Sequence, residues 1–296
     1  MERCWCFSIA EHCVEIKSTD ENIDIEETNP NLLPFRTENC NLDTLIRMSI
    51  VPALEDDSDF CEVGDFDTGN GHTKVEKNDS TGKYRFLIRN IKEIPVAKML
   101  ATGDFSSCEL CVYAENHANR NFGINSALMM AFAFAGAFHQ TLLIHASTVK
   151  LGEYAYAFIA KSGTGKSTQV NNWLKYIADT ELLNDDNPVV RVIDGEAFIY
   201  GSPWSGKTPC YRQIKARLGA VTRIERALYN KCVRQNIVEA FASFLPSCST
   251  MKWDSTIYDG VINTISSIIK TTGIYKLYCL PDRESAEVCH KQICQQ

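Results

Sequence analysis

The chain has 296 residues, of which 45% are apolar and 23% charged, so it is long and apolar enough for a full globular core. Its net charge is −7, but residues 11–67 hold 16 acidic and 3 basic side chains (3 − 16 = −13), which leaves +6 for the rest (−7 + 13). No basic stripe interleaved with aromatics occurs, which argues against nucleic acid as a partner. The positive remainder suits anionic ligands such as phosphates.

No segment of the sequence indicates a membrane partner. The opening residues MERCWCFSIAEHC lack the apolar core of a secretory signal. The longest apolar run, residues 127–138, has 12 residues, which is too short to span a bilayer and predicts a buried helix. We therefore expect a soluble, cytoplasmic protein.

Thirteen cysteines are scattered along the chain without the spacing of a small secreted scaffold. Cys4 with Cys6 and Cys108 with Cys111 are close pairs, but nothing in the sequence joins them into a four-ligand zinc set. The stretch SSCELCVYAE alternates like a half-buried strand, with Cys108 and Leu110 on one face. We expect reduced, mostly buried structural thiols and leave metal binding open.

Residues 1–120 are predicted to form a β-rich region whose role the sequence does not indicate. Strand composition is clear at residues 6–16, 84–90 and 108–115, and a turn-rich loop separates the first two. The acidic stretch STDENIDIEETNPNLLP is expected to be exposed. No catalytic motif occurs in this region.

Residues 121–296 alternate between helical and strand patterns. A helix is predicted at 124–139, and strands at 141–149 and 155–160; a Gly-rich loop follows, and then an amphipathic helix in which apolar residues recur from Val170 to Ile177. Further strands are predicted on both sides of Asp194-Gly195, at 214–227 and at 274–280, with helices around 237–244 and 262–269 and at 282–294. The fold class is therefore α/β in the mixed α+β sense, with a second domain that begins at residue 121.

The loop AKSGTGKS, residues 160–167, fits the pattern of a phosphate-binding loop between a strand and a helix. Glycines let backbone N–H groups converge on a phosphate, and the helix that follows adds its positive N-terminal end. The lysine would reach the β- and γ-phosphate oxygens, and the serine after it would bind Mg²⁺. The predicted nucleotide contacts are Ser162, Gly163, Thr164, Gly165, Lys166, Ser167 and Thr168.

The stretch LLNDDNPVV supplies two carboxylates, Asp185 and Asp186, 19 and 20 positions after Lys166. Adjacent strand residues point to opposite faces, so the two side chains are expected to have different roles. One would bind Mg²⁺, and the other would accept the proton of an attacking hydroxyl. As a working assignment we place Asp186 with Ser167 on the metal and keep the choice between the two open. The alternative is a structural turn before Pro188.

Two further features are candidates for substrate contact. His145 follows an apolar strand, where a histidine is either a core residue or a catalytic one. The Pro- and Gly-rich loop GSPWSGKTPCYR, residues 201–212, offers Lys207 and Arg212 as anion contacts. Its alternative interpretation is a stiff connection with solvated charges.

The order of IHAS, SGTGKST and NDDN resembles the HPr kinase/phosphorylase family and its structural relatives, the ATP-dependent phosphoenolpyruvate carboxykinases. His145 matches the histidine before the loop of HPr kinases, and the Asp pair matches theirs. The loop pattern S-G-x-G-K-S is matched by Ser162, Gly163, Gly165, Lys166 and Ser167. The resemblance covers residues 142–289, about half of the chain, and no second HPr-kinase signature follows.

The resemblance implies a phosphate-loop kinase domain with ATP and Mg²⁺ as cofactors, and a γ-phosphoryl transfer to a hydroxyl. His145, Lys166, Asp185 and Asp186 would be the catalytic residues. The acceptor would be a serine of a protein or peptide, or a small hydroxylated molecule. A non-catalytic nucleotide-binding regulatory module is the alternative function, and homo-oligomerisation is left open.

Overall fold

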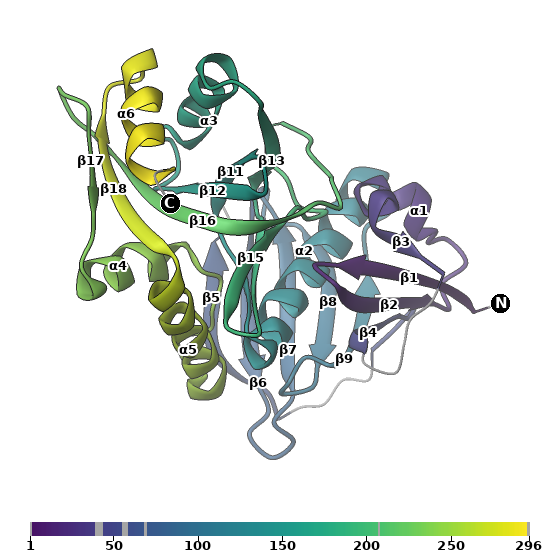
Figure 1. Ribbon diagram of the computed structural model, residues 1–296. Helices are drawn as coiled ribbons and strands as arrows, with labels where there is room; N and C mark the ends of the chain where they lie inside the picture. The colour runs from purple at the N-terminus through teal and green to yellow at the C-terminus, as the bar shows by residue number, and fades with distance from the viewer. Residues whose placement is uncertain (1, 39–43, 55–58, 68–69, 207, 295–296) are drawn as a thin grey trace. The chain divides into compact units, whose positions relative to one another are not determined.

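The computed structural model in Figure 1 describes residues 2–38, 44–54, 59–67, 70–206 and 208–294. With 30% helix and 41% strand, it confirms the mixed α/β class. The chain divides into two compact units. Unit 1 is Met1–Phe138 with Met251–Ser255, and unit 2 is His139–Thr250 with Thr256–Gln296.

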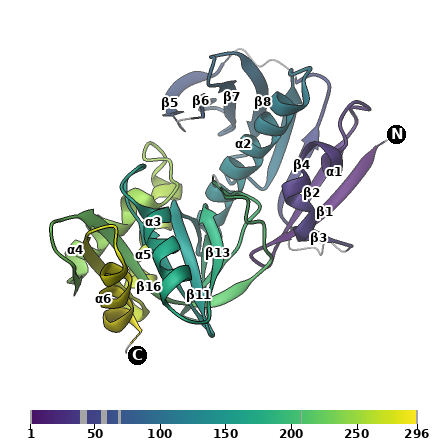
Figure 2. The same ribbon diagram turned by 90° about the horizontal axis from the view of Figure 1, so that it is seen from above.

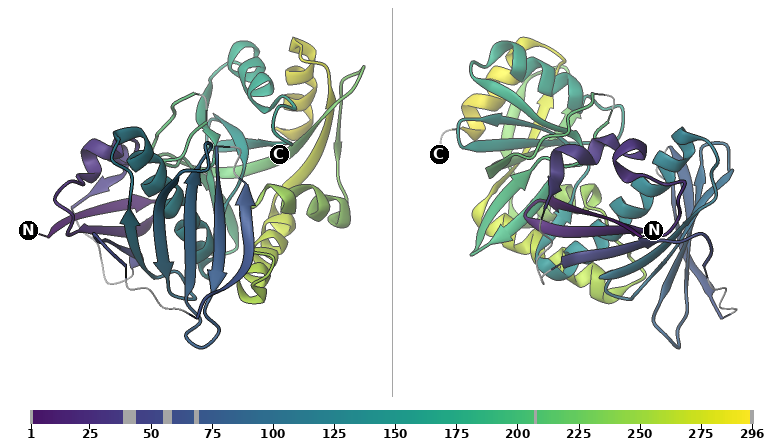
Figure 3. Two further views of the ribbon diagram at one scale, coloured as in Figure 1. Left: turned by 180° about the vertical axis from the view of Figure 1, so that it is seen from behind. Right: turned by 90° about the vertical axis from the view of Figure 1, so that its right-hand side faces the viewer.

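Unit 1 is built on a nine-stranded sheet in the order β3-β1-β2-β4-β9-β8-β7-β6-β5. The β2–β4 and β4–β9 pairs are parallel and the other pairs antiparallel. Figure 3 shows strands β5–β9, drawn in blue, side by side from behind. The strands are β1 (Arg3–Ile9), β2 (His12–Ser18), β3 (Arg36–Thr37), β4 (Thr44–Ile50), β5 (Cys61–Asp67), β6 (Gly71–Lys77), β7 (Tyr84–Asn90), β8 (Pro95–Ala101) and β9 (Ser107–Val112).

The long helix α2 (His117–Gly136) packs on strands β4, β7, β8 and β9 (Figure 2). Residues 117–139 are long and apolar enough to cross a membrane, yet 72% of their apolar 18-residue window is buried inside the structure. This burial explains the apolar composition, since a core helix of a soluble fold has the same one. Two short helical segments, α1 (Ile25–Thr28) and the 3₁₀ turn Pro30–Phe35, complete the helices of unit 1.

The observed helix α2 differs from two boundaries predicted from the sequence: the first residue of this helix and the boundary between the two domains. Asn116 caps it by accepting the N–H of Asn119, so it begins at His117 and not at residue 124. Its first two turns are polar, and the apolar pattern that predicted the helix starts only after them. The helix packs on the sheet of unit 1, so the domain boundary predicted at residues 120 and 121 falls inside it. The structure moves that boundary to Phe138.

Aromatic side chains fill the core of unit 1. Phe105 stacks on Tyr84 at 5.5 Å and meets Phe134 edge-on at 5.2 Å. Segment Met251–Ser255 joins this unit because Trp253 packs on Phe66 at 5.2 Å, and because Asp254 accepts the Tyr84 hydroxyl at 2.5 Å. The region predicted to be β-rich is therefore a sheet with its own core.

Unit 2 contains a second mixed sheet, in the order β10-β14-β15-β16-β12-β11-β13, with β18 beside β16 and β17 beside β18. The β12–β16 and β16–β18 pairs are parallel. The strands are β10 (Thr141–Leu143), β11 (Ala146–Leu151), β12 (Tyr154–Ile159), β13 (Thr180–Asp186), β14 (Val189–Ile193), β15 (Glu196–Tyr200), β16 (Lys215–Arg226), β17 (Lys231–Arg234) and β18 (Gly273–Cys279). The helices are α3 (Lys166–Tyr176), α4 (Ile237–Phe244), α5 (Ser255–Thr271) and α6 (Arg283–Ile293), with a short 3₁₀ turn at Leu245–Ser247; another 3₁₀ turn, Ala137–His139, spans the boundary between the units.

Helices α3 and α6 lie side by side (Figure 1), and Trp173 anchors α3 to the sheet beneath. The Trp173 ring is fully buried and meets Tyr156 at 5.4 Å and Phe158 at 5.6 Å. The amphipathic pattern predicted this face correctly at Val170 and Trp173, but Leu174 of the same pattern is exposed. Because α3 is fixed to β12, the loop that joins them is held at both ends.

The strand predicted at 141–149 is interrupted. It forms β10 and β11, with Ile144 and His145 between them. Ile144 bridges to Cys248, and the His145 N–H donates to the Ser247 carbonyl at 2.7 Å. The main chain at these two residues therefore pairs with the 247–248 segment, and His145 lies between the ladders of β10 and β11.

The thiols follow the prediction in most cases. Among the described residues, eleven cysteines are free, and Cys108 and Cys111 are buried in β9, where they donate to the carbonyls of Phe105 and Pro52. Burial raises the pKa of both thiols, which agrees with a structural role. Cys13 departs from the prediction, because it is disulfide-bonded.

Candidate functional site

The loop at residues 160–165, called the glycine loop below, connects β12 to α3 within unit 2. Gly163 and Gly165 have φ angles of 75° and 129°, and no atom lies within 4 Å of the place where a side chain would project. Only glycine adopts such conformations readily. Gly165 is the N-cap of α3 and makes no side-chain cap. The first-turn N–H groups of α3, which lack partners within the helix, therefore have no capping side chain at Gly165.

Arg226, at the end of β16, holds the glycine loop from one side. Its guanidinium donates to the carbonyls of Gly163 and Thr164, the latter at 3.0 Å. The C=O and N–H of a trans peptide point in opposite directions, so the N–H of Gly165 points away from Arg226. The loop thus presents the Gly165 amide hydrogen on the side opposite to Arg226, whereas the Thr164 N–H already donates to the Lys161 carbonyl at 3.1 Å.

Lys166 lies directly after the glycine loop and is buried, with 9% of its surface exposed. Its ammonium donates to Nε2 of His145 at 2.7 Å and to the Ala160 carbonyl at 3.3 Å. Burial lowers the pKa of Lys166, and the negative charges of Asp186 and Asp185 only partly oppose this. No carboxylate of a described residue lies within 4.0 Å of the ammonium, so the cation is hydrogen-bonded but has no close counter-charge.

His145 connects Lys166 to Asp186. Its Nδ1 lies 3.0 Å from Oδ1 of Asp186. An ammonium can only donate, so the simplest assignment is a neutral imidazole that accepts from Lys166 at Nε2 and donates from Nδ1 to Asp186. Burial alone would raise the pKa of Asp186, but the hydrogen bond from His145, followed by the charge of Lys166 and the hydrogen bond from Asn187, lowers it overall. Asp186 is thus ionised at neutral pH while its side chain stays 34% exposed.

The backbone at Asp186 is strained. Its φ angle is 129°, a conformation that costs a non-glycine residue about 1–3 kcal/mol. The surrounding loop holds it there: Ser205 forms a bridge with Asp186, and Gly206 donates its N–H to the Asp185 carbonyl. A Cβ on Gly206 would lie 3.1 Å from that of Asp186. Such strain is typical of functional positions, and here it turns the carboxylate toward His145.

Asp185 faces a different set of partners and is 6% exposed. Its Oδ1 accepts the hydroxyl of Ser147 at 2.7 Å and that of Ser167 at 3.4 Å. Ser147 lies opposite Asp185 in the β11–β13 ladder. The structure therefore brings Ser167 to Asp185, whereas the working assignment placed it with Asp186. The two carboxylates have separate environments, as the alternation along the strand predicted.

The other predicted contacts divide into two groups. Thr164, Gly165 and Thr168 line a cavity of about 360 Å³ beside the glycine loop, and Ser162 is exposed at the tip of the loop. Arg212 pairs with Glu181 at 2.6 Å and donates to the Leu182 carbonyl, at the start of β13. Glu181 is four positions from Asp185 along β13, a distance of about 13 Å. The structure thus places Arg212 away from the aspartates, and Lys207 lies outside the described residues.

Several residues of the site were not predicted. Ser147 contacts Asp185, and Arg226 contacts the glycine loop. Neither residue belongs to a sequence motif. Asn184 is fully buried and donates to Ser202 and to the Trp204 carbonyl, which holds the 201–212 loop against the aspartate strand. The sequence held one signal for these Asn184 contacts: an asparagine stands on each side of the aspartate pair in NDDN.

A larger cavity of about 630 Å³ lies elsewhere in unit 2, between β17, α4 and α5. Its lining is mainly apolar, with Ile237, Val238 and Ile269 among the residues that form it, and it contains none of the predicted contacts. Cavity size therefore does not select the site; the arrangement of charged and polar side chains does.

No protein-family model matches the chain, and no curated protein matches its sequence. The site must be interpreted from its own geometry. Within the described part of unit 2, that geometry consists of an uncapped helix N-terminus after a glycine loop, a buried lysine, and two separately placed carboxylates.

Proposed function

We propose that unit 2 is a phosphate-loop kinase domain of the HPr kinase-like type, which binds ATP with Mg²⁺ and transfers the γ-phosphoryl group to a hydroxyl. The observation that carries this proposal is the connected set Lys166–His145–Asp186 next to the Ser167–Asp185 pair. A buried ammonium without a close counter-charge calls for an anion, and an ionised, half-exposed carboxylate 3.0 Å from an imidazole can accept a proton.

The glycine loop fits the polyphosphate of a nucleotide. The amide hydrogens of the loop and of the first turn of α3 are donors suited to phosphate oxygens, and the helix terminus favours negative charge. Lys166 would exchange its hydrogen bond to His145 for a phosphate oxygen. The 360 Å³ cavity, lined by Thr168 and Gln169, would hold the remainder of the nucleotide.

Ser167 and Asp185 are the residues that would hold Mg²⁺. Both offer oxygen ligands, which this hard cation prefers, and their oxygens already lie 3.4 Å apart. The bound ion would neutralise charge on the phosphate oxygens. This revises the working assignment of Asp186 to the metal, because Asp186 is committed to His145.

Asp186 is then the residue that accepts the proton of the incoming hydroxyl. His145 holds one carboxylate oxygen and Asn187 the other, at 2.9 Å, which fixes the plane of the group. In phosphoryl transfer the catalytic aspartate acts mainly by orienting the hydroxyl and accepting its proton, so a low pKa is compatible with this role. Catalysis would come chiefly from positioning and charge neutralisation.

The regulatory-module alternative requires only one carboxylate. A nucleotide-binding module needs Asp185 for the metal, and it has no use for a second, strained aspartate held by a histidine. The strain at Asp186 therefore favours catalysis over simple binding. The acceptor stays open between a serine of a protein or peptide and a small hydroxylated molecule.

The test is phosphoryl transfer from γ-³²P-labelled ATP with Mg²⁺ to separate protein and small-molecule fractions of a cell lysate. Wild type should label one fraction. Asp186→Asn should keep ATP affinity within about tenfold and lower transfer by about 1,000-fold or more. Asp185→Asn should raise the Mg²⁺ concentration needed for ATP binding, because it removes a metal ligand.

Asp194→Asn is the matched control, since it changes an aspartate in the exposed β14–β15 turn of the same unit at a φ of 51° that asparagine tolerates. It should bind ATP and transfer like wild type. Wild-type transfer by both Asp185→Asn and Asp186→Asn would refute the catalytic assignment. ATP that binds tightly and stays intact in every fraction would support the regulatory module instead.

A further inference from the structure

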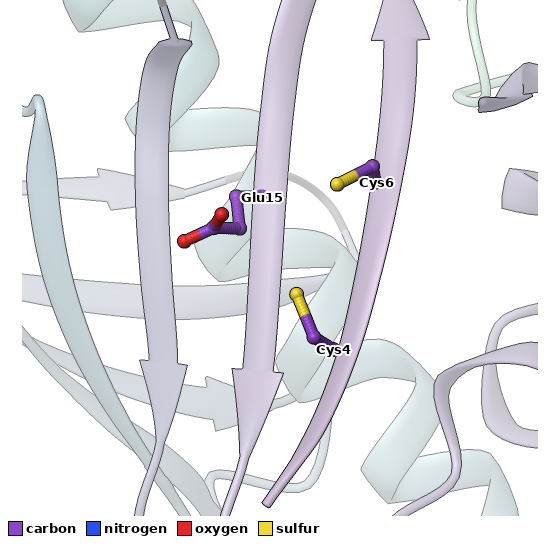
Figure 4. Close-up of side chains that lie close together, drawn as sticks. All are labelled: Cys4, Cys6 and Glu15. Carbon is purple, nitrogen blue, oxygen red and sulfur yellow. The ribbon is translucent and has the colours of Figure 1, made fainter. Parts of the chain in front are cut away.

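A second cluster of chemically reactive side chains lies in unit 1, on the outer face of the β1–β2 hairpin (Figure 4). In this antiparallel pair, Cys6 is opposite Glu15 and Cys4 is opposite Lys17. Side chains alternate along a strand, so Cys4 and Cys6 share one face, while Trp5 between them is buried on the other. The two sulfurs and a carboxylate oxygen of Glu15 lie within 4.8 Å of one another.

We propose that Cys4, Cys6 and Glu15 form a binding site for a thiophilic divalent cation of the zinc type. Two thiolates and one carboxylate are a ligand set that suits this cation. Metal–sulfur bonds of about 2.3 Å and metal–oxygen bonds of about 2.1 Å separate tetrahedral ligands by roughly 3.6–3.8 Å. The observed separations of up to 4.8 Å need only an adjustment of about 1 Å, which side-chain rotation provides.

The hairpin holds these ligands in register before any metal arrives. Seven residue pairs connect β1 to β2, and the turn residues Ala10 and Glu11 have φ angles of 49° and 62°. Two positive φ angles define the tight turn whose twist matches the strands, and this turn sets which residues face each other. A slip of one residue would move Glu15 to the buried face, so the register itself specifies the cluster.

The chemistry of the cluster also suits a divalent cation. Glu15 supplies a carboxylate beside the two sulfurs, and the Lys17 ammonium lies 3.6 Å from that carboxylate. A divalent cation would displace the protons of the two thiols and bind the resulting thiolates together with the carboxylate. Cys4 is exposed, so a metal could enter and keep a fourth position open to water. Cys13 is disulfide-bonded and is not a ligand.

The experiment is a competition between the full-length chain, purified under anaerobic conditions, and a chromogenic chelator for Zn²⁺. Wild type is expected to hold one equivalent, and Cys4→Ser and Cys6→Ser to lose it. Glu15→Gln should weaken binding by about tenfold or more, because it removes one negative ligand. Lys17→Met should strengthen binding several-fold, because it removes a competing positive charge near Glu15.

Cys61→Ser is the matched control, since Cys61 is also an exposed free thiol on a strand of unit 1 but lies outside the cluster. It should bind Zn²⁺ like wild type. In parallel, Zn²⁺ should protect Cys4 and Cys6 from alkylation, measured on the tryptic peptide 4–17. Equal zinc content in wild type, Cys4→Ser and Cys6→Ser would overturn the proposal, and so would unchanged alkylation of this peptide. Far-UV circular dichroism of the metal-free variants separates metal loss from misfolding.

Discussion

Each unit of the molecule contains a buried charged side chain, Glu76 in unit 1 and Lys166 in unit 2, and the two charges have different surroundings. In unit 1, Glu76 is 7% exposed and lies between Arg85 at 2.6 Å and Lys74 at 3.1 Å. Burial alone would raise the pKa of Glu76, but the hydrogen bonds and charges of Arg85 and Lys74 lower it overall. In unit 2, Lys166 has an imidazole and a carbonyl as partners, and burial lowers its pKa.

The difference separates a structural charge from a functional one. A buried charge with two counter-charges contributes to a rigid sheet, and removing it takes a shared counter-charge away from both partners. A buried cation without a close counter-charge costs stability, and proteins retain such a cost mainly where an anionic ligand supplies the missing charge. On this physical ground we place the proposed phosphate chemistry in unit 2. The following predictions test that contrast, from the largest expected effect to the smallest.

Lys166→Met should abolish function without loss of stability. Methionine preserves the length and packing of the side chain but removes the charge, so ATP affinity should fall by about 100-fold and phosphoryl transfer by about 1,000-fold. Because burial lowers the pKa of Lys166, the charged form costs stability in the folded state; methionine removes that cost, so the thermal midpoint should be no lower than that of wild type. Calorimetric titration with ATP and thermal unfolding measure the two quantities. Unchanged ATP affinity would remove the glycine loop from the proposed function.

Glu76→Gln should have the opposite effect. The change leaves Arg85 and Lys74 without their shared counter-charge, and we expect the free energy of unfolding to fall by about 3 kcal/mol. ATP affinity should stay at the wild-type value, because Glu76 contacts no residue of the proposed site. Denaturant unfolding and calorimetry check both. A large loss of ATP affinity in folded Glu76→Gln would contradict the separation of roles.

Gly206→Ala should impair transfer but not binding. The new methyl group would lie 3.1 Å from the Asp186 Cβ and 3.2 Å from the Asp185 carbonyl, so the strained aspartate must shift by a few tenths of an ångström. We expect transfer to fall by about tenfold with ATP affinity retained. Gly123→Ala in α2 is the matched control, since its methyl group would lie equally close, 3.1 Å, to Ala97 in unit 1. That control should change the thermal midpoint and leave transfer per folded molecule intact.

The smallest effect concerns acid stability. The folded state lowers the pKa of Asp186, so the unfolded chain binds a proton more readily. The ionised Asp186 carboxylate therefore stabilises the fold above about pH 4, the ordinary pKa of an aspartate. This stabilisation is lost as the pH falls through the pKa that Asp186 has in the folded state. The stability advantage of wild type over Asp186→Asn should therefore be about 1 kcal/mol or less near pH 6 and shrink toward pH 2. A constant difference across this range would show that the His145 and Lys166 contacts do not act on this carboxylate.

Much of unit 2 could be predicted because its signals are local. The period of Val170 and Trp173 identified helix α3 and its buried face, and Asp194-Gly195 marked the turn between β14 and β15. For unit 1 the sequence predicted strand segments at residues 6–16, 84–90 and 108–115 but not how they pair. Its pairing order includes two parallel contacts between strands distant in sequence, and such register depends on packing over the whole sheet.

The candidate site shows the same division. The residue types and order of His145, Lys166 and the aspartate pair follow from the sequence, since their chemistry depends on side-chain type and on a strand, loop and helix that are locally encoded. The tertiary structure alone decided which aspartate meets which partner. Ser147 lies opposite Asp185 through strand pairing, and Gly206 lies against Asp186 through loop packing. These neighbours are set by long-range contacts and a strained φ angle, which no local pattern of residues encodes.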